Sequence, residues 1–82
     1  MKQLQQLDEF KLSCLYILEN NYTGNKNLFK VIGFRTPKNS TTKHHVCIEW
    51  CDDGTSANFF QDSFDNYSIY EISKEHNPEY YL

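Results

Sequence analysis

HHVCIEWCDDG, residues His44 to Gly54, is the stretch that decides the fold, and it gathers two histidines, two cysteines and three acids. Such side chains can ligate a metal, form a catalytic cluster or make up the polar face of a β-hairpin. Apolar side chains alternate with them at Val46, Ile48 and Trp50, and Asp53-Gly54 is a strong signal for a two-residue hairpin turn. The alternation favours the third possibility, a strand with one buried and one exposed face.

A turn at Asp53-Gly54 would pair Trp50 with Ala57 and Ile48 with Phe59, with Val46 on the same face. That face is apolar throughout, so we expect it to join the core. The remaining side chains of the two strands would point outward and form the surface of the hairpin. They are His45, Cys47, Glu49 and Cys51, opposite Asp62, Phe60, Asn58 and Ser56.

The same register tests the stretch as a metal site. Cys47 and Cys51 would lie about 13 Å apart at roughly 3.3 Å per residue, which is too far for one zinc ion or a disulfide. His45 and Cys47, with Asp62 opposite, could supply three ligands, and this alternative stays open. The surface of a hairpin is the stronger interpretation, so no metal and no other cofactor is expected.

Catalysis has little support in the sequence. Cys47 beside His45 would need a cleft to hold a substrate, which an exposed sheet face does not supply by itself. The chain contains no G-x-S-x-G, P-loop or H-E-x-x-H motif. We therefore expect a protein that is not an enzyme and has no catalytic residue.

The rest of the chain predicts one helix and three more strands. Apolar residues recur at spacings of three or four over residues 3–19, which is typical of an amphipathic helix; they are Leu4, Leu7, Phe10, Cys14, Ile17 and Leu18. A strand over residues 10–18 is the competing interpretation, because apolar residues also alternate there. With the hairpin strand at 44–52, further strands are expected at 28–36, at 55–61 and at 67–72, before a short tail at 73–82. Gly33 inside the first of these indicates either a bulge or a close packing neighbour.

These elements predict a single α+β domain over residues 1–82, in which the N-terminal helix packs on a four-stranded antiparallel sheet. The run from Val46 to Phe60 resembles SH3-type and Tudor-type barrels, since it joins an apolar strand, a DG turn and an aromatic strand. The resemblance implies that the sheet could curl into a partial barrel. It rests on a hairpin pattern that many folds share, and no function is carried over from it.

The composition predicts a cytoplasmic protein. No run approaches the ~18 consecutive apolar residues that cross a membrane, and Asp8 and Glu9 interrupt the N-terminal segment, which is therefore no signal peptide. Three cysteines, an odd number, fit a reducing compartment.

Thirteen aromatic residues are more than one small core is expected to hold, so some of them should be available for a partner or a second copy.

Charge divides the chain into two parts. Residues 20–48 contain five cations and no acid, whereas the residues from Glu49 onward contain eight acids and a single lysine. Pairing of basic with acidic strands across the sheet is the simpler explanation. A two-signed surface that attracts a charged partner is the alternative.

The best functional hypothesis is a non-enzymatic interaction protein, because acids speed encounter with a basic partner while tyrosines supply contact area. Its expected interaction residues are Asp52, Asp53, Asp62, Asp65, Tyr67 and Tyr70. The second hypothesis is binding of single-stranded nucleic acid or RNA through residues 26–45, and its residues are Lys30, Arg35, Lys38 and Lys43. A homodimer is compatible with both, since small aromatic-rich domains gain stability by association.

Overall fold

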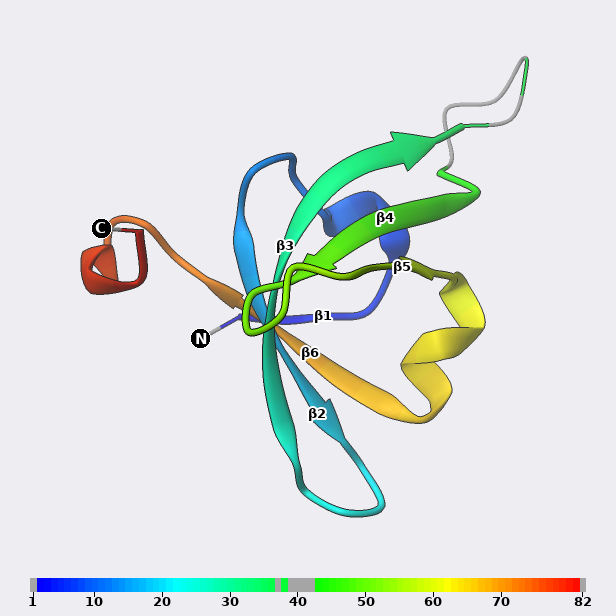
Figure 1. Cartoon of the computed structure of the whole chain (residues 1–82). Helices are drawn as coiled ribbons and strands as arrows, with labels where there is room; N and C mark the ends of the chain where they lie inside the picture. Colours follow the sequence, from blue (N-terminus) through cyan, green and yellow to red (C-terminus); the bar gives the residue numbers. More distant parts are fainter. Residues whose placement is uncertain (1, 37, 39–42, 82) are drawn as a thin grey trace.

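The chain folds into one antiparallel sheet of six strands, shown in Figure 1. The computed structural model describes residues 2–36, 38 and 43–81. The strands are β1 (Lys2–Leu4), β2 (Leu15–Asn20), β3 (Lys26–Arg35), β4 (His45–Trp50), β5 (Ser56–Phe59) and β6 (Tyr67–Ile72). Three 3₁₀ turns complete the described part of the chain: η1 (Leu7–Glu9), η2 (Gln61–Asp65) and η3 (Pro78–Tyr81). The predicted antiparallel sheet is confirmed.

The N-terminal helix predicted over residues 3–19 is wrong, and the α+β fold class with a helix on four strands is wrong with it. Those residues form β1, η1, a turn and β2, and Ser13 adopts a φ of 63°, which no α-helix accommodates. β2 pairs with β3 on one side and with β6 on the other, so both edges of its backbone are hydrogen-bonded. These long-range pairs outweigh the local helical periodicity. The competing strand over residues 10–18 was nearer, since β2 begins at Leu15.

Two further strand pairings distinguish the sheet from the expected one. The strand order is β1-β6-β2-β3-β4-β5, so the last strand lies between the first two instead of beside β5. β1 and β5 are the two edges, and among the described residues strand pairing does not close the sheet into a barrel. The side chain of Gln61 links the two sides instead. Its Oε1 accepts a hydrogen bond of 3.1 Å from Leu7 N–H, and its Nε2 donates one of 3.0 Å to the Gln5 carbonyl.

The core lies on the inner face of the curved sheet and takes a side chain from every strand. Phe10, in the loop after η1, is 1% exposed and lies at the centre of the aromatic group, with its ring 4.9 Å from that of Tyr16 and 5.8 Å from that of Phe59. Phe29 stacks on Tyr16 at 5.6 Å. The other members are Leu4, Leu7, Leu18, Val31, Val46, Ile48 and Ile69. Gly33 follows a register shift between Val31 and Gly33, which is a bulge, the first of the two expected alternatives.

The β4–β5 hairpin has a longer turn than the two residues expected. Trp50 N–H donates to the Thr55 carbonyl at 2.8 Å, so residues 51–54 form a four-residue loop. Only Gly54 of this loop has a positive φ, 73°, whereas a type I′ turn requires positive φ at both central positions. Ile48 therefore faces Ala57 and Val46 faces Phe59. The predicted register is off by two residues, which leaves the buried face unchanged but moves Trp50 to the end of the ladder.

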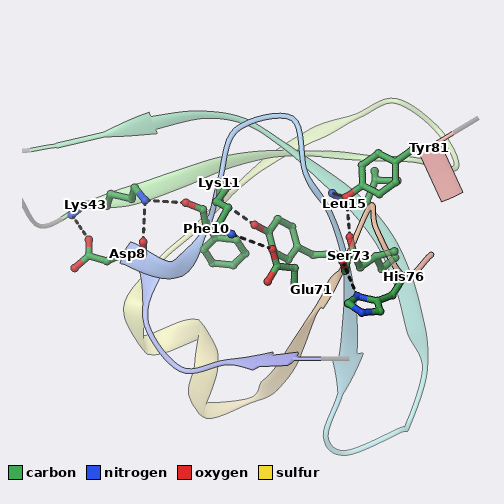
Figure 2. A network of polar contacts seen from close by, with 11 residues as sticks. Asp8, Phe10, Lys11, Leu15, Lys43, Glu71, Ser73, His76 and Tyr81 are labelled. Carbon is green, nitrogen blue, oxygen red and sulfur yellow. Dashed lines mark hydrogen bonds and ion pairs between the residues drawn. The ribbon is translucent and has the colours of Figure 1, made fainter. Parts of the chain in front are cut away.

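Polar clamps hold the irregular segments against the sheet, and Figure 2 shows them together. Lys43 Nζ donates to the carbonyls of Asp8 at 3.2 Å and Phe10 at 2.8 Å. The buried Tyr16 hydroxyl accepts a hydrogen bond of 2.9 Å from Lys11 N–H, and burial raises the pKa of Tyr16 well above its ordinary value. The Tyr81 hydroxyl accepts from Leu15 N–H and donates to the carbonyl of Ile72, which binds η3 to the sheet.

Candidate functional site

A hollow of about 370 Å³ lies on the inner face of the sheet, beside the turn that joins β2 and β3. Its floor consists of core side chains, Leu18, Ile48 and Phe59. Binding sites for small ligands and side chains have volumes of about 300–1,000 Å³, so this hollow is at the small end of that range. Its other lining residues are Asn20, Asn25, Asn27, Trp50, Ala57, Asn58, Ser63 and Tyr67.

Trp50 and Tyr67 line this hollow from different sides of the sheet. Trp50 is the last residue of β4 and Tyr67 is the first of β6, and β2 and β3 lie between these strands. Both side chains are half-buried and pack against the core, and Trp50 meets Phe29 edge-on at 5.8 Å. They therefore offer aromatic surface on a rigid support, which is the arrangement that favours stacking with a ligand group.

Asparagine side chains provide most of the polar groups near the hollow. Asn20 is fixed, because its Oδ1 accepts hydrogen bonds from the backbone N–H groups of Tyr22 at 2.9 Å and Thr23 at 3.2 Å. Asn27 pairs with Leu18 across the sheet, so its side chain is on the inner face. The Asn27 side chain is exposed and makes no hydrogen bond within the described part of the chain. Asn58 instead pairs with Cys47, which puts its side chain on the outer face.

The charges around the hollow are mostly negative. None of its lining residues is charged. Three acids in the β4–β5 turn and η2 lie within two residues of a lining position, namely Asp52, Asp62 and Asp65. Glu19, Glu49 and Lys26 also adjoin lining positions, but they alternate with inner-face residues of their strands and lie on the outer face. A charge acts on a bound group within roughly the 8 Å Debye length of physiological salt. The neighbourhood therefore favours cations and disfavours phosphate groups.

The six residues expected to bind a basic partner divide between two faces. Asp52 and Asp53 lie in the β4–β5 turn, and Asp62 and Asp65 lie in η2. Tyr67 lines the hollow, but Tyr70 pairs with Gln3 and Ile17 on the outer face. Tyr67 therefore lines the hollow and closely follows Asp62 and Asp65 of η2 in the sequence, whereas Tyr70 lies on the opposite face of the sheet.

Asp53 has a structural role in its turn. Its Oδ1 accepts hydrogen bonds from Thr55 N–H at 3.0 Å and from the Thr55 hydroxyl at 2.7 Å. These two bonds hold the pKa of Asp53 below its ordinary value. The carboxylate is therefore engaged within the hairpin, whereas Asp52 beside it is exposed.

The four cations expected to bind nucleic acid are also dispersed. Lys30 pairs with Glu49 on the outer face. Lys43 is held by the carbonyls of Asp8 and Phe10, with its Nζ 4.1 Å from the Phe34 ring centroid. Arg35 and Lys38 line a second hollow, together with Thr36, His44 and His45. Arg35 and Lys38 therefore share one hollow, which His44 and His45 also line.

The register removes the three-ligand arrangement that was left open. His45 lies next to Phe60, with ring centroids 5.4 Å apart, and Asp62 belongs to η2 instead of β5. Among the described residues, no group of three or more His, Cys, Asp or Glu side chains could hold a metal ion. Cys14, Cys47 and Cys51 are free thiols, and partial burial raises the pKa of Cys51 above its ordinary value.

Tyr67 is the one lining residue that the sequence indicated as a site, and the other lining residues, Trp50, Asn27 and Ser63 among them, were not indicated. Trp50 was expected inside the core, and the asparagines were not considered. The asparagine-rich run from Asn20 to Asn27 was the available signal, since five of its eight residues are asparagines or glycine. A run of this composition is also typical of a plain turn, so it does not by itself predict a site.

The comparisons with known proteins found no match among family models, curated proteins or solved structures. No helix in the described part of the chain has the length and the apolar character needed to cross a membrane. The residues that line the hollow and the acids in the segments beside it therefore carry the functional proposal.

Proposed function

We propose that the protein is a small non-enzymatic interaction module that binds a basic protein partner at the hollow lined by Trp50 and Tyr67. The observation that carries the proposal is the combination of an aromatic, uncharged hollow with acids in the segments beside it. Carboxylates raise the rate of encounter with a basic surface, and desolvated aromatic side chains supply the affinity.

The chemistry of the lining supports binding more than catalysis. Its side chains are aliphatic, aromatic, amide or hydroxyl groups, and none of them is a carboxylate, histidine, cysteine or lysine. General acid–base catalysis near neutral pH most often uses groups of those missing kinds, and Tyr67 is the one titratable side chain among these lining residues. Ser63 is the one aliphatic hydroxyl in the lining, and it accepts a hydrogen bond of 3.2 Å from Phe60 N–H within η2.

The test measures binding of a lysine- and arginine-containing peptide, with a glutamate-containing peptide of equal length as the negative probe. Trp50 is the sole tryptophan, so its fluorescence reports directly on the hollow. We expect binding of the basic peptide that weakens as salt rises. The combined changes Asp52→Asn, Asp62→Asn and Asp65→Asn should weaken it several-fold.

Two tail acids provide the matched control for these substitutions. Glu75→Gln and Glu79→Gln also remove negative charge, but both residues lie near η3, and neither adjoins a lining residue in the sequence. They should weaken the basic peptide much less per charge removed. Equal losses from both sets of substitutions would reduce the effect to net charge and contradict a site at the hollow, as would binding that ignores salt.

Single-stranded nucleic-acid or RNA binding is the second candidate, favoured by the hollow in which Arg35 and Lys38 lie with His44 and His45. Two cations and two imidazoles can contact a phosphate, and the exposed Phe60 ring lies 6.0 Å from His44. A fluorescent oligonucleotide should then bind with an affinity that falls steeply with salt and with Arg35→Gln. An affinity independent of salt would rule this candidate out.

A further inference from the structure

We propose that the hollow receives the guanidinium group of an arginine side chain of the basic partner, an inference that rests on the proposed function. The juxtaposition that points to it is an aromatic lining from Trp50 and Tyr67, an exposed amide at Asn27 and an apolar floor. An arginine side chain matches each of these parts with a different portion of its own structure.

The aromatic part of the lining suits a planar cation. A guanidinium stacks flat on aromatic rings and is attracted by the electron density of the ring face, most strongly by tryptophan. An ammonium group is also attracted, but it is compact and more strongly hydrated, so it loses more on leaving water. Trp50 is rigidly supported by its edge-on contact with Phe29 at 5.8 Å, and a rigid ring costs less conformational entropy when a ligand binds.

The polar groups can accept the hydrogen bonds that a guanidinium must donate. The amide oxygen of Asn27 is on the inner face and has no partner in the described chain, and Asn25 lies beside it at the turn. Asn20 is excluded from this role because its Oδ1 already accepts two backbone N–H groups. Neutral acceptors suffice here, since the acids nearby supply the long-range attraction.

The floor suits the rest of the side chain. Leu18, Ile48 and Phe59 present apolar surface beneath the polar rim. The three methylene groups of arginine can lie along such surface while the charged end stays near the acceptors. A phosphate or a carboxylate has no such apolar stem, would find no cation in the lining and would be repelled by Asp52, Asp62 and Asp65 in the adjoining segments.

The test uses three small probes that separate charge from shape. N-acetyl-L-arginine amide carries the planar cation, its citrulline analogue has nearly the same shape without charge, and its lysine analogue has the charge without the planar group. Binding is followed by the fluorescence of Trp50 and by the NMR shift of its indole N–H. We expect the arginine probe to bind about two- to fivefold more tightly than the citrulline analogue, which is the range expected for a cation–π contact. It should also bind more tightly than the lysine analogue, because the ammonium group is more strongly hydrated and cannot stack flat on the rings; equal binding of the arginine and lysine probes would overturn the choice of a guanidinium.

Substitutions in the hollow should remove this preference. Tyr67→Leu and Asn27→Ala should each weaken the arginine probe, while the citrulline probe changes less. Tyr80→Leu is the matched control, since Tyr80 is 42% exposed in η3 and does not line the hollow. A thermal unfolding curve for each variant confirms that it is folded at the temperature of the titration.

The outcomes distinguish this inference from the proposed function. Equal binding of the arginine and citrulline probes overturns the inference, because a neutral planar group would then suffice. Binding of a neutral sugar or a nucleotide at Trp50 in place of arginine also overturns it. If the basic peptide still binds with its dependence on the three aspartates, and Tyr67→Leu and Asn27→Ala have no effect, the proposed function stands and the arginine site does not.

Discussion

Replacing Tyr16 by phenylalanine tests both the fold and the energy of its core. Tyr16 is 0% exposed, and its ring stacks on Phe29 at 5.6 Å and meets Phe10 edge-on at 4.9 Å. A helix over residues 3–19 would leave Tyr16 outside its apolar stripe, so the substitution would then have little effect. In the observed fold it removes the hydroxyl that accepts the Lys11 N–H at 2.9 Å.

The size of the destabilisation follows from the Lys11 N–H, which loses its hydrogen-bond acceptor in the variant. A partly buried backbone N–H without an acceptor costs about 1–3 kcal/mol, and the retained ring keeps the aromatic contacts in place. We therefore expect Tyr16→Phe to lower the free energy of unfolding by about 1–2 kcal/mol. For a domain of this size that corresponds to a fall of roughly 4–16 °C in Tm. It is a large part of the roughly 4–12 kcal/mol expected for the whole chain.

The pH dependence of stability provides a second, independent test of the Tyr16 hydroxyl. Burial raises the pKa of Tyr16 in the folded protein above its value in the unfolded chain. A raised pKa contributes stability that is fully present below the unfolded value, about 10, and is lost as pH rises above it. Wild-type protein should therefore lose stability above about pH 10 more steeply than the phenylalanine variant. The difference between the two should narrow as the pH rises.

The assay is urea unfolding followed by the fluorescence of Trp50, repeated at several pH values. Tyr80→Phe is the control, because it removes the same atom from a side chain that is 42% exposed, and it should change stability by less than about 0.5 kcal/mol. Equal losses of stability in Tyr16→Phe and Tyr80→Phe would refute a buried, hydrogen-bonded hydroxyl at Tyr16. So would a variant whose stability falls with pH in parallel with the wild type.

Three further predictions concern the loop before β2, the link across the sheet and self-association. Phe10→Leu should destabilise the protein by about 2 kcal/mol in urea unfolding, because its ring meets four others, whereas Leu12→Ala, at a position 55% exposed, should cost under about 0.5 kcal/mol. Gln61→Ala should lower the free energy of unfolding by about 1–2 kcal/mol, because the side chain loses its hydrogen bonds to Leu7 N–H and the Gln5 carbonyl. Gln6→Ala is the control at an exposed position. Equal stability of the two variants would contradict the link across the sheet. If the predicted homodimer forms through the outer face, light scattering should show a mass that rises above 9.8 kDa with concentration and returns to it in Ile17→Asp; a constant 9.8 kDa mass would contradict the dimer.

The strands from β3 onward were readable from the sequence because their signals are local. Val31 and Ile32 stand in a β-branched apolar run that a central strand requires, and Gly33 marks the bulge. Alternation of Val46 and Ile48 with polar residues defines the buried face of β4. A register error of two residues left that face intact, since side chains alternate with a period of two.

The N-terminal segment could not be read in the same way, because its structure depends on partners far away in the sequence. Leu4 and Leu7 are buried as the helical pattern requires, but they reach the core from β1 and η1. β1 is only three residues long and pairs with β6, which begins more than sixty residues later. Apolar residues at spacings of three or four fit a helix, and they also fit a short strand followed by a turn.

The candidate site depends on the length of the β4–β5 turn, which the alternation of buried and exposed residues does not determine. With a two-residue turn, Trp50 would face Ala57 inside the hairpin and would be an ordinary core residue. The four-residue loop makes Trp50 the last paired residue of β4, so part of its ring remains accessible beside the asparagines of the β2–β3 turn. Turn length is set by Gly54 at positive φ and by the bonds from Thr55 to Asp53, details that the DG pattern alone does not specify. A change that shortens this loop should therefore bury Trp50 and abolish arginine binding together, which links the local geometry of one turn to the function proposed for the whole chain.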